Sequence, residues 1–327
     1  MDTSVEQAGT LLPGAAGSAE LRVAVLIPCH NEAIAIATVV ADFRAALPGA
    51  RVFVYDNNST DATVAAAQAA GAVVRREMLQ GKGYVIRRAF ADVEADVYVL
   101  VDGDDTYDAA AAPGMVRRLV EEQLDMVTAT RIADWPAGYR RGHRFGNRLL
   151  TRLVSYTFGS RVTDMLSGYR VFSRRFVKSF PALSAGFEIE TEVTVHALEL
   201  AMPVAEVAAR YRDRPAGSRS KLHTVSDGLR ILRTILVLVK QERPLQFFAL
   251  AGLLLLAAGV ALGVPVIVEF LHTGLVPRLP TAVLATGLVL LSFLSFSCGL
   301  ILESVARGRK EMKRLAYLAI PAPAAPY

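Results

Sequence analysis

A group of carboxylates that follows an apolar run is the strongest chemical signal in this sequence. The run Tyr98–Val101 has the pattern of a buried strand and ends in Asp102-Gly103-Asp104-Asp105. Because Asp102 and Asp104 lie two residues apart, a turn there can aim both carboxylates at one cation. Hard oxygen ligands of this kind suit Mg²⁺ or Mn²⁺, which also bridge to substrate phosphates. The alternative is a solvated acidic turn that caps the following helix.

Two further polar clusters follow apolar runs earlier in the chain. Pro28–Glu32 comes after the predicted strand Leu21–Ile27, and Asp56–Asp61 comes after the predicted strand Val52–Tyr55. Helical patterns such as Ala33–Leu47 separate the strands, so the sequence predicts an α/β domain with a mostly parallel sheet flanked by helices. Such sheets bind ligands beyond the carboxyl ends of their strands. We therefore expect the three clusters at one edge, where a nucleotide sugar would find partners for its base, ribose and diphosphate.

Four motifs follow one another in the first part of the chain. They are Val25–Glu32, Tyr55–Asp61, Gly81-Lys82-Gly83 and Asp102-Gly103-Asp104. In these motifs and their order, the chain from about Arg22 to Arg243 resembles the family 2 glycosyltransferases, whose nucleotide-sugar-binding domain has the GT-A fold. The resemblance implies that Asp102 and Asp104 bind the metal, with Asp102 on the nucleotide-sugar side. It further implies that the nucleoside part of the donor is held by Pro28, Asn31, Glu32 and Asp56.

The second and third motifs leave two questions open. Family members usually have Asp-Asp-Gly-Ser where this chain has Asp56-Asn57-Asn58-Ser59, so the choice between a UDP-sugar and a GDP-sugar stays open. Asn tolerates the left-handed backbone that Gly would supply, and we expect the turn itself to survive. Lys82, beside two glycines at a helix start, is either a phosphate ligand or a solvated surface lysine.

Three later blocks resemble a subgroup, the polyprenyl-phosphate glycosyltransferases related to dolichyl-phosphate-mannose synthase. They are Asp164–Arg174, Phe187–Glu192 and Arg214–Lys221. The acceptor that this resemblance implies is a lipid phosphate, which is largely ionised at neutral pH and needs no strong base. It does need cations beside it before it can approach a diphosphate. The candidates for this role are Arg131, Arg170, Arg219 and Lys221.

We expect the catalytic residues to be Asp104, Asp164 and Arg170. Asp164 has three interpretations: it orients the acceptor or an arginine, it acts as a base if the acceptor is a hydroxyl, or it is a turn carboxylate. Glu190 is a weaker candidate for a site contact, because it shares a face with Glu188 and Glu192 in a strand but not in a helix.

Two uncharged runs follow the predicted catalytic domain. Leu245–Val268 and Thr281–Leu302 are each long enough to cross a hydrocarbon core of ~30 Å, and a buried core helix is the alternative. Cations flank the outer ends of both runs, so the positive-inside rule predicts cytoplasmic ends and an external hairpin. Thr224–Lys240 has the pattern of an amphipathic helix in the membrane interface, and Arg140–Phe158 is either a second such helix or an ordinary surface helix.

Composition agrees with a membrane protein. The 327-residue chain is 53% hydrophobic and carries a formal net charge of +5, which suits an anionic membrane or a phosphate ligand as well as a nucleic acid. Its two cysteines lack zinc spacing and do not indicate a disulfide framework. The expected organisation is a mobile tail (1–20), a cytoplasmic GT-A domain (21–223), an interfacial helix (224–243), two transmembrane helices (244–305) and a basic cytoplasmic tail (306–327).

The leading hypothesis is an inverting hexose transfer from a UDP- or GDP-sugar to polyprenyl phosphate at the cytoplasmic membrane face, with Mg²⁺ or Mn²⁺ and without nucleic acid. A membrane-anchored transferase that uses a glycan or glycolipid hydroxyl is the first alternative. A non-catalytic membrane scaffold that senses sugar nucleotides is another. A nucleotidyltransferase is less favoured, because the first strand is not followed by a Gly-rich loop with arginine. The oligomeric state, including a homo-oligomer, is left open.

Overall fold

The computed structural model describes residues 10–11, 21–133, 163–215, 237, 240 and 243–322. The chain divides into two units, and each is described by itself: residues 1–228 with 313–327, and residues 229–312. Several predictions lie outside the described residues and stay predictions. They concern most of the N-terminal tail, the segment Arg140–Phe158, Arg219, Lys221 and nearly all of the interfacial helix.

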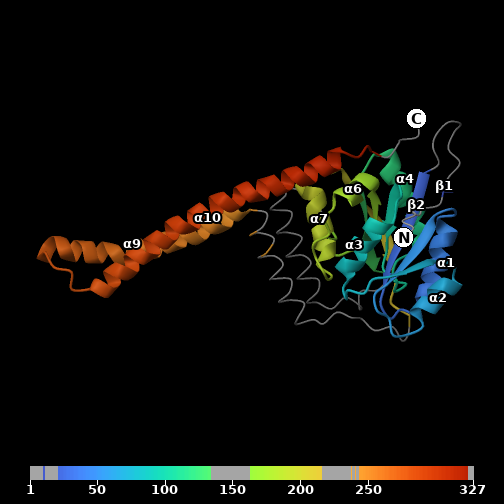
Figure 1. Ribbon diagram of the computed structural model, residues 1–327, viewed down its shortest axis with the longest axis horizontal. Coiled ribbons are helices and arrows are strands. Elements are labelled where there is room, and N and C mark those ends of the chain that lie inside the picture. The colour runs from blue at the N-terminus through green and yellow to red at the C-terminus, as the bar shows by residue number, and fades with distance from the viewer. Residues whose placement is uncertain are drawn as a thin grey trace, which may run out of the picture. The chain divides into compact units, whose positions relative to one another are not determined.

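A mixed sheet forms the core of the first unit (Figure 1). Its order is β4-β3-β2-β5-β7-β6-β8, and β1 pairs with β2 off this path. Neighbours on the path run parallel except where β7 lies antiparallel between β5 and β6. The prediction of a mostly parallel sheet is thus confirmed. The strands are β1 (Thr10–Leu11), β2 (Leu21–Cys29), β3 (Arg51–Asp56), β4 (Val73–Arg76), β5 (Val97–Leu100), β6 (Met126–Ala133), β7 (Arg170–Ser173) and β8 (Val204–Tyr211).

Helices cover both faces of this sheet, as its apolar strands require. Successive strand side chains point to opposite faces, so Val25 and Ile27 of β2 join one apolar layer and Leu26 joins the other. The first layer includes side chains of α1 (Ile36–Ala46), α2 (Thr63–Ala69) and α4 (Ala112–Glu121), which a short turn, η1 (Ala109–Ala111), precedes. The second includes side chains of α3 (Lys82–Asp92), α6 (Arg174–Ser179) and α7 (Ile189–Glu199).

Two elements differ from their predicted form in ways that matter for the site. β6 extends to Ala133, four residues beyond the strand Met126–Ala129 that the sequence predicts, because β8 pairs with it from Met126 to Ala133. The Phe187–Glu192 block, which the sequence leaves open between strand and helix, becomes the start of α7 at Ile189. Glu190 and Glu192 therefore lie in a first helical turn, where the helix dipole favours carboxylates.

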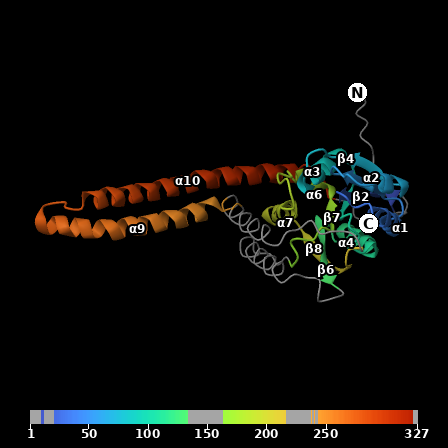
Figure 2. The same ribbon diagram turned by 90° about the horizontal axis from the view of Figure 1, so that it is seen from below.

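The second unit contains two long apolar helices that lie side by side (Figures 1 and 2). They are α9 (Pro244–Thr273) and the part of α10 (Leu279–Leu318) that ends at Met312. Small residues allow close contact between them: a Cβ added to Gly259 would lie 2.9 Å from Val289 Cγ2. Only 17% of the most apolar window of each helix is buried, so neither is a buried core helix within this structure. Both are long and apolar enough to cross a membrane.

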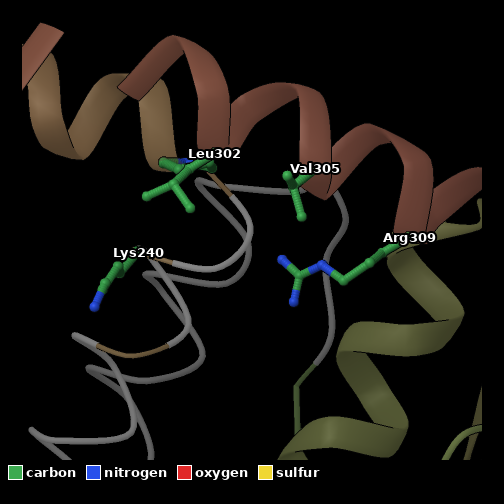
Figure 3. A pocket seen from close by; sticks show the side chains of 5 residues that line it. Lys240, Leu302, Val305 and Arg309 are labelled. Carbon is green, nitrogen blue, oxygen red and sulfur yellow. The ribbon is translucent and has the colours of Figure 1, made fainter. Parts of the chain in front are cut away.

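A small pocket lies where these helices meet their basic flank (Figure 3). It has a volume of about 200 Å³ and is lined by Lys240, Pro244, Leu302, Val305 and Arg309. Apolar side chains next to two cations are typical of the zone where a helix leaves the hydrocarbon for the headgroup layer.

The predicted basic tail differs from the structure, because α10 continues through Leu318. Its last turns fold with the first unit. The Tyr317 hydroxyl donates to Asp125 Oδ2 over 2.8 Å, and Lys313 Nζ lies 2.7 Å from Glu199 Oε2. The hydrophobic pattern of the sequence does not predict polar side-chain contacts of this kind. From the sequence alone, the segment is therefore expected to be a tail.

Candidate functional site

The carboxyl ends of β2, β3 and β5 meet at one edge of the sheet, here called the rim. Cys29 at the end of β2 pairs with Asp56 at the end of β3, and Leu26 pairs with Leu100 at the end of β5. Asp102 and Asp104 follow β5 directly. The structure therefore brings the three predicted polar clusters together, as the parallel strand order demands.

Backbone and side-chain hydrogen bonds join the first two clusters. Asn31, with a left-handed φ of 53°, accepts from the Thr60 N–H at 2.8 Å through its Oδ1. Its own N–H donates to Ser59 Oγ at 2.9 Å. Glu32 donates its N–H to Thr63 Oγ1 at 2.8 Å. The two loops are thus fixed to each other at the edge where the nucleoside is expected.

Pro28 and Asp56 belong to the strand ends beneath these loops. Pro28 pairs with Tyr55 in the register between β2 and β3. The buried Asp56 carboxylate accepts from the Ser59 N–H at 3.3 Å. Asn58 has a φ of 61°, so the left-handed turn expected for an Asn at this position is present.

Asn57, which replaces a family carboxylate, has a structural role. Its Nδ2 donates to the carbonyls of Glu77 and Leu79 at 2.9 and 2.8 Å, and its Oδ1 accepts from the Gly81 N–H at 2.7 Å. A carboxylate could not donate the first two bonds. The amide thereby fastens the loop that leads to Lys82.

Lys82 is buried between two carboxylates at the start of α3. Its Nζ lies 2.5 Å from Asp102 Oδ1 and also contacts Glu190 Oε1. Only 8% of the lysine side chain and 11% of the Glu190 side chain are exposed, which excludes a solvated surface lysine. Burial by itself lowers the pKa of Lys82, but the charges of Asp102 and Glu190 outweigh it and raise that pKa above its ordinary value.

The two glycines of the third motif are needed because another loop packs on them. A Cβ on Gly81 would lie 2.2 Å from the Ala185 carbonyl oxygen, and one on Gly83 would lie 1.9 Å from that of Ser184. This loop leads directly into α7. The close packing therefore sets Glu190 opposite Lys82.

Asp104 is held by an arginine from the loop after β8. Arg214 Nη2 lies 2.6 Å from Asp104 Oδ2, and its Nη1 lies 3.9 Å from Glu32 Oε1. The Thr106 hydroxyl donates to Asp104 Oδ1 over 2.6 Å. The arginine thus connects the ends of β2 and β5 across the rim.

The residues at the tip of β5 fit a divalent cation. Among the described residues, no group of three or more His, Cys, Asp or Glu side chains gathers as a metal site. Asp102 and Asp104 supply hard oxygens for an ion that takes its other ligands from phosphates and water. Lys82 pairs with Asp102 and Arg214 pairs with Asp104, so the surroundings of the two carboxylates already favour positive charge. Gly168 leaves room beside them, since a Cβ there would lie 2.1 Å from Asp102 Oδ2.

Arg131 and Asp164 form a forked ion pair near the carboxyl ends of β6 and β8. Arg131 Nε and Nη2 lie 2.7 Å from Asp164 Oδ2 and Oδ1. The guanidinium also lies 5.6 Å from the centre of the Tyr211 ring. Burial alone raises the pKa of Asp164, but its hydrogen bonds with Arg131 and the charge of that residue bring it below the ordinary value.

Sequence comparisons assign the family. The profile of "Glycosyl transferase family 2" matches residues 24–180. Glycosyltransferase AglJ of Haloferax volcanii is 33% identical over 300 residues, which cover 90% of this chain and 98% of AglJ. The chain belongs to glycosyl transferase family 2.

Two further comparisons give a relative in sequence and a solved structure of similar fold. A dolichyl-phosphate hexose transferase of Haloferax volcanii is 28% identical over 220 residues, covering 67% of this chain and 95% of that protein. The crystal structure of glucosyl-3-phosphoglycerate synthase from Mycobacterium tuberculosis with Mn²⁺, UDP and glucosyl-3-phosphoglycerate matches with a TM-score of 0.55. That match covers 66% of this chain and 79% of the other, at 22% identity, and shows a shared fold.

One predicted site residue of this glycosyltransferase has its side chain buried beneath the rim. Arg170, on β7, is 1% exposed. Its guanidinium donates to the carbonyls of Ser167 and Met165 at 3.0 and 2.6 Å and to Thr194 Oγ1 at 2.7 Å. An interior arginine whose donors are used by the protein is not placed to bind an acceptor phosphate. We therefore correct its expected role from phosphate ligand to buried structural cation.

Two residues at the rim of this glycosyltransferase were not among the predicted ligands. The sequence predicts Glu190 only as a weaker candidate, because its segment fits a strand as well as a helix. Arg214 lies in the block Arg214–Lys221, from which Arg219 and Lys221 are the predicted phosphate ligands. Only the packing of α7 and of the loop after β8 onto the rim identifies them.

Proposed function

We propose that the protein is a membrane glycosyltransferase that moves one hexose from a UDP- or GDP-sugar to a polyprenyl phosphate, with inversion at the anomeric carbon. The donor would bind at the rim and the acceptor phosphate beside Arg131. The product would be a polyprenyl-phosphate-linked sugar on the cytoplasmic leaflet.

The Arg131–Asp164 pair is the observation that carries this choice of acceptor. A sugar hydroxyl must lose its proton during transfer, and a useful base has a pKa near the working pH. The pKa of Asp164 lies below its ordinary value because Arg131 holds the carboxylate in its charged form. A phosphate acceptor is already ionised and requires no base. Asp164 would then position Arg131, whose guanidinium suits phosphate oxygens.

The donor assignment is supported by the arrangement of charges at the rim. Asp102 and Asp104 would hold Mg²⁺ or Mn²⁺, and Lys82 and Arg214 lie within reach of the same place. When bound, such an ion acts as a Lewis acid that stabilises the departing diphosphate. The glucosyl-3-phosphoglycerate synthase of the same fold was crystallised with Mn²⁺ and UDP, which agrees with this assignment.

The membrane part is supported by the two apolar helices and by the dolichyl-phosphate hexose transferase relative. Basic residues lie before α9 and after the apolar part of α10, whereas the hairpin between them carries one arginine, Arg278. By the positive-inside rule both helix ends with the catalytic unit would face the cytoplasm. Sugar nucleotides would reach the rim from that side.

The proposal is tested with purified full-length protein, undecaprenyl phosphate and a panel of radiolabelled UDP- and GDP-sugars. We expect one donor to label the lipid, and the label to be released by mild acid, because a glycosyl phosphate hydrolyses far more readily than an ordinary glycoside. Label that resists mild acid, or that appears only with a glycan or glycolipid acceptor, would favour the hydroxyl-acceptor alternative. Nucleotide binding without turnover on any acceptor would favour the scaffold alternative.

A further inference from the structure

Glu190 is a rim residue to which the proposed reaction gives no role. It lies in the first turn of α7 and shares the Lys82 ammonium with Asp102. The three side chains are not equally accessible: Asp102 is 30% exposed, against 8% for Lys82 and 11% for Glu190. Asp102 is therefore the member of this trio that solvent or a cation can reach, whereas Glu190 lies in the interior.

If a divalent cation binds Asp102 while Lys82 is still paired with the same carboxylate, the two positive charges repel each other. Like charges within a few ångströms repel strongly where water is largely excluded. If Asp102 were the only partner of Lys82, a metal that takes this carboxylate would leave a buried ammonium unpaired, which is costly. Glu190 supplies a second carboxylate, so the Lys82 ammonium stays paired when Asp102 binds the metal.

We propose that Glu190 is a positioning residue that retains Lys82 when a divalent cation takes Asp102. This inference rests on the proposed function, in which Asp102 binds the metal. Lys82 stays paired with Glu190 throughout, so Asp102 is released without expelling the lysine from the interior. Glu190 raises the affinity for the metal although it is not a ligand.

The two carboxylates nearest to Glu190 in the sequence cannot replace it. Glu192 accepts from the N–H groups of Leu183 and Ser184 at 2.9 and 2.8 Å and so holds the loop that packs on the third motif. Glu188 precedes the helix, and the ion pairs of Lys82 are with Asp102 and Glu190. It therefore provides a control that removes one negative charge two residues away.

The experiment measures Mn²⁺ binding to the full-length protein in detergent with UDP, from the electron paramagnetic resonance signal of free Mn²⁺. Glu190→Gln should weaken binding by roughly tenfold or more, the size seen when a residue that orients a metal ligand is lost. Glu188→Gln should bind Mn²⁺ within about twofold of the wild type, because its charge is not part of the Lys82 group.

The deciding variant is the double substitution Glu190→Gln with Lys82→Met. Removing the lysine frees Asp102, so Mn²⁺ affinity should return to the wild-type value or exceed it. If Glu190 is instead a direct metal ligand, the double variant will remain weak, and the inference is overturned. Should Glu190→Gln fail to fold, Glu190→Asp keeps the charge but shortens its reach to Lys82, and the same weakening is expected.

Failure of this inference is distinguishable from failure of the proposed function. A wild-type protein that binds Mn²⁺ and labels the lipid, together with a Glu190→Gln variant of equal Mn²⁺ affinity, overturns the role of Glu190 alone. A wild-type protein that binds no Mn²⁺ contradicts the metal assignment and the role of Glu190 with it.

Discussion

Arg170 carries its charge in the interior of the first unit, with backbone carbonyls and a threonine as partners. Its sequence position, within a block that resembles an acceptor site, suggested a phosphate ligand. The reason it is buried is β7, a short antiparallel strand between β5 and β6 that draws Arg170 into the sheet. No local pattern in the sequence predicts that β7 runs antiparallel to its two neighbours.

Arg170→Met should therefore destabilise the protein. It leaves the Ser167 and Met165 carbonyls without their donor, and we expect a loss of about 3 kcal/mol in the free energy of unfolding. Thermal unfolding of the purified protein measures it. Arg174→Met is the matched control, because Arg174 is 42% exposed beside Glu94 and should cost less than about 1 kcal/mol. An Arg170→Met protein of wild-type stability with a raised KM for the lipid acceptor would contradict the structural role.

His196 predicts how stability depends on pH. Burial among Phe176 and Phe180, with a smaller effect of the Lys313 charge, lowers the pKa of His196 from 6.5 to about 3. Between these values the unfolded chain binds a proton that the folded protein does not. The free energy of unfolding should fall as the pH falls below 6.5, by up to about 1.4 kcal/mol per pH unit.

His196→Gln removes this titration. We expect the wild type to lose about 1 kcal/mol more than the variant between pH 6.5 and 5.5, as measured by thermal unfolding at each pH. Equal losses in the two proteins would show that His196 is not held neutral in the folded state.

At the scale of elements, the β-α-β order and the three polar clusters at strand ends followed from apolar runs and their spacing. These signals are local, so the sequence carries them directly. Placement of α7 against α3 was not predictable, because it depends on the loop Ser184–Gly186 packing onto Gly81 and Gly83. Glu190 became a site residue through that contact alone.

The last turns of α10 make a second contact that the sequence did not reveal. Asp125, fully buried before β6, binds Arg175 and Ser173 as well as Tyr317. Arg175 also lies 4.9 Å from the centre of the Tyr317 ring. The C-terminal turns thus complete the environment of a buried carboxylate.

Tyr317→Phe should lower the stability of the first unit by about 1 kcal/mol, because it removes one hydrogen bond to that carboxylate. The measurement is thermal unfolding of the full-length protein. Leu315→Ala, at an exposed position of the same turns, should change little. If the two substitutions have equal effects, the contact with Asp125 does not contribute to stability.

At the scale of the whole molecule, the proposed topology has the catalytic unit and both helix ends on the cytoplasmic side. This can be measured with single cysteines at Leu275, in the hairpin, and at Ala322, after α10, with Cys29 and Cys298 changed to serine. A membrane-impermeant maleimide should label the first in intact cells and the second only after permeabilisation, as the positive-inside rule predicts. Labelling in the reverse pattern would place the rim on the side that lacks sugar nucleotides.

In the proposed reaction, Asp104 helps a cation stabilise the leaving diphosphate while a lipid phosphate attacks. The most direct test compares wild type and Asp104→Asn, both inserted in membranes, for the formation of acid-labile sugar on undecaprenyl phosphate with Mg²⁺ or Mn²⁺. We expect the wild type to form this product and to stop when the metal is chelated, and Asp104→Asn to lose at least about 100-fold in rate. Turnover of Asp104→Asn close to that of the wild type would rule out this role of Asp104.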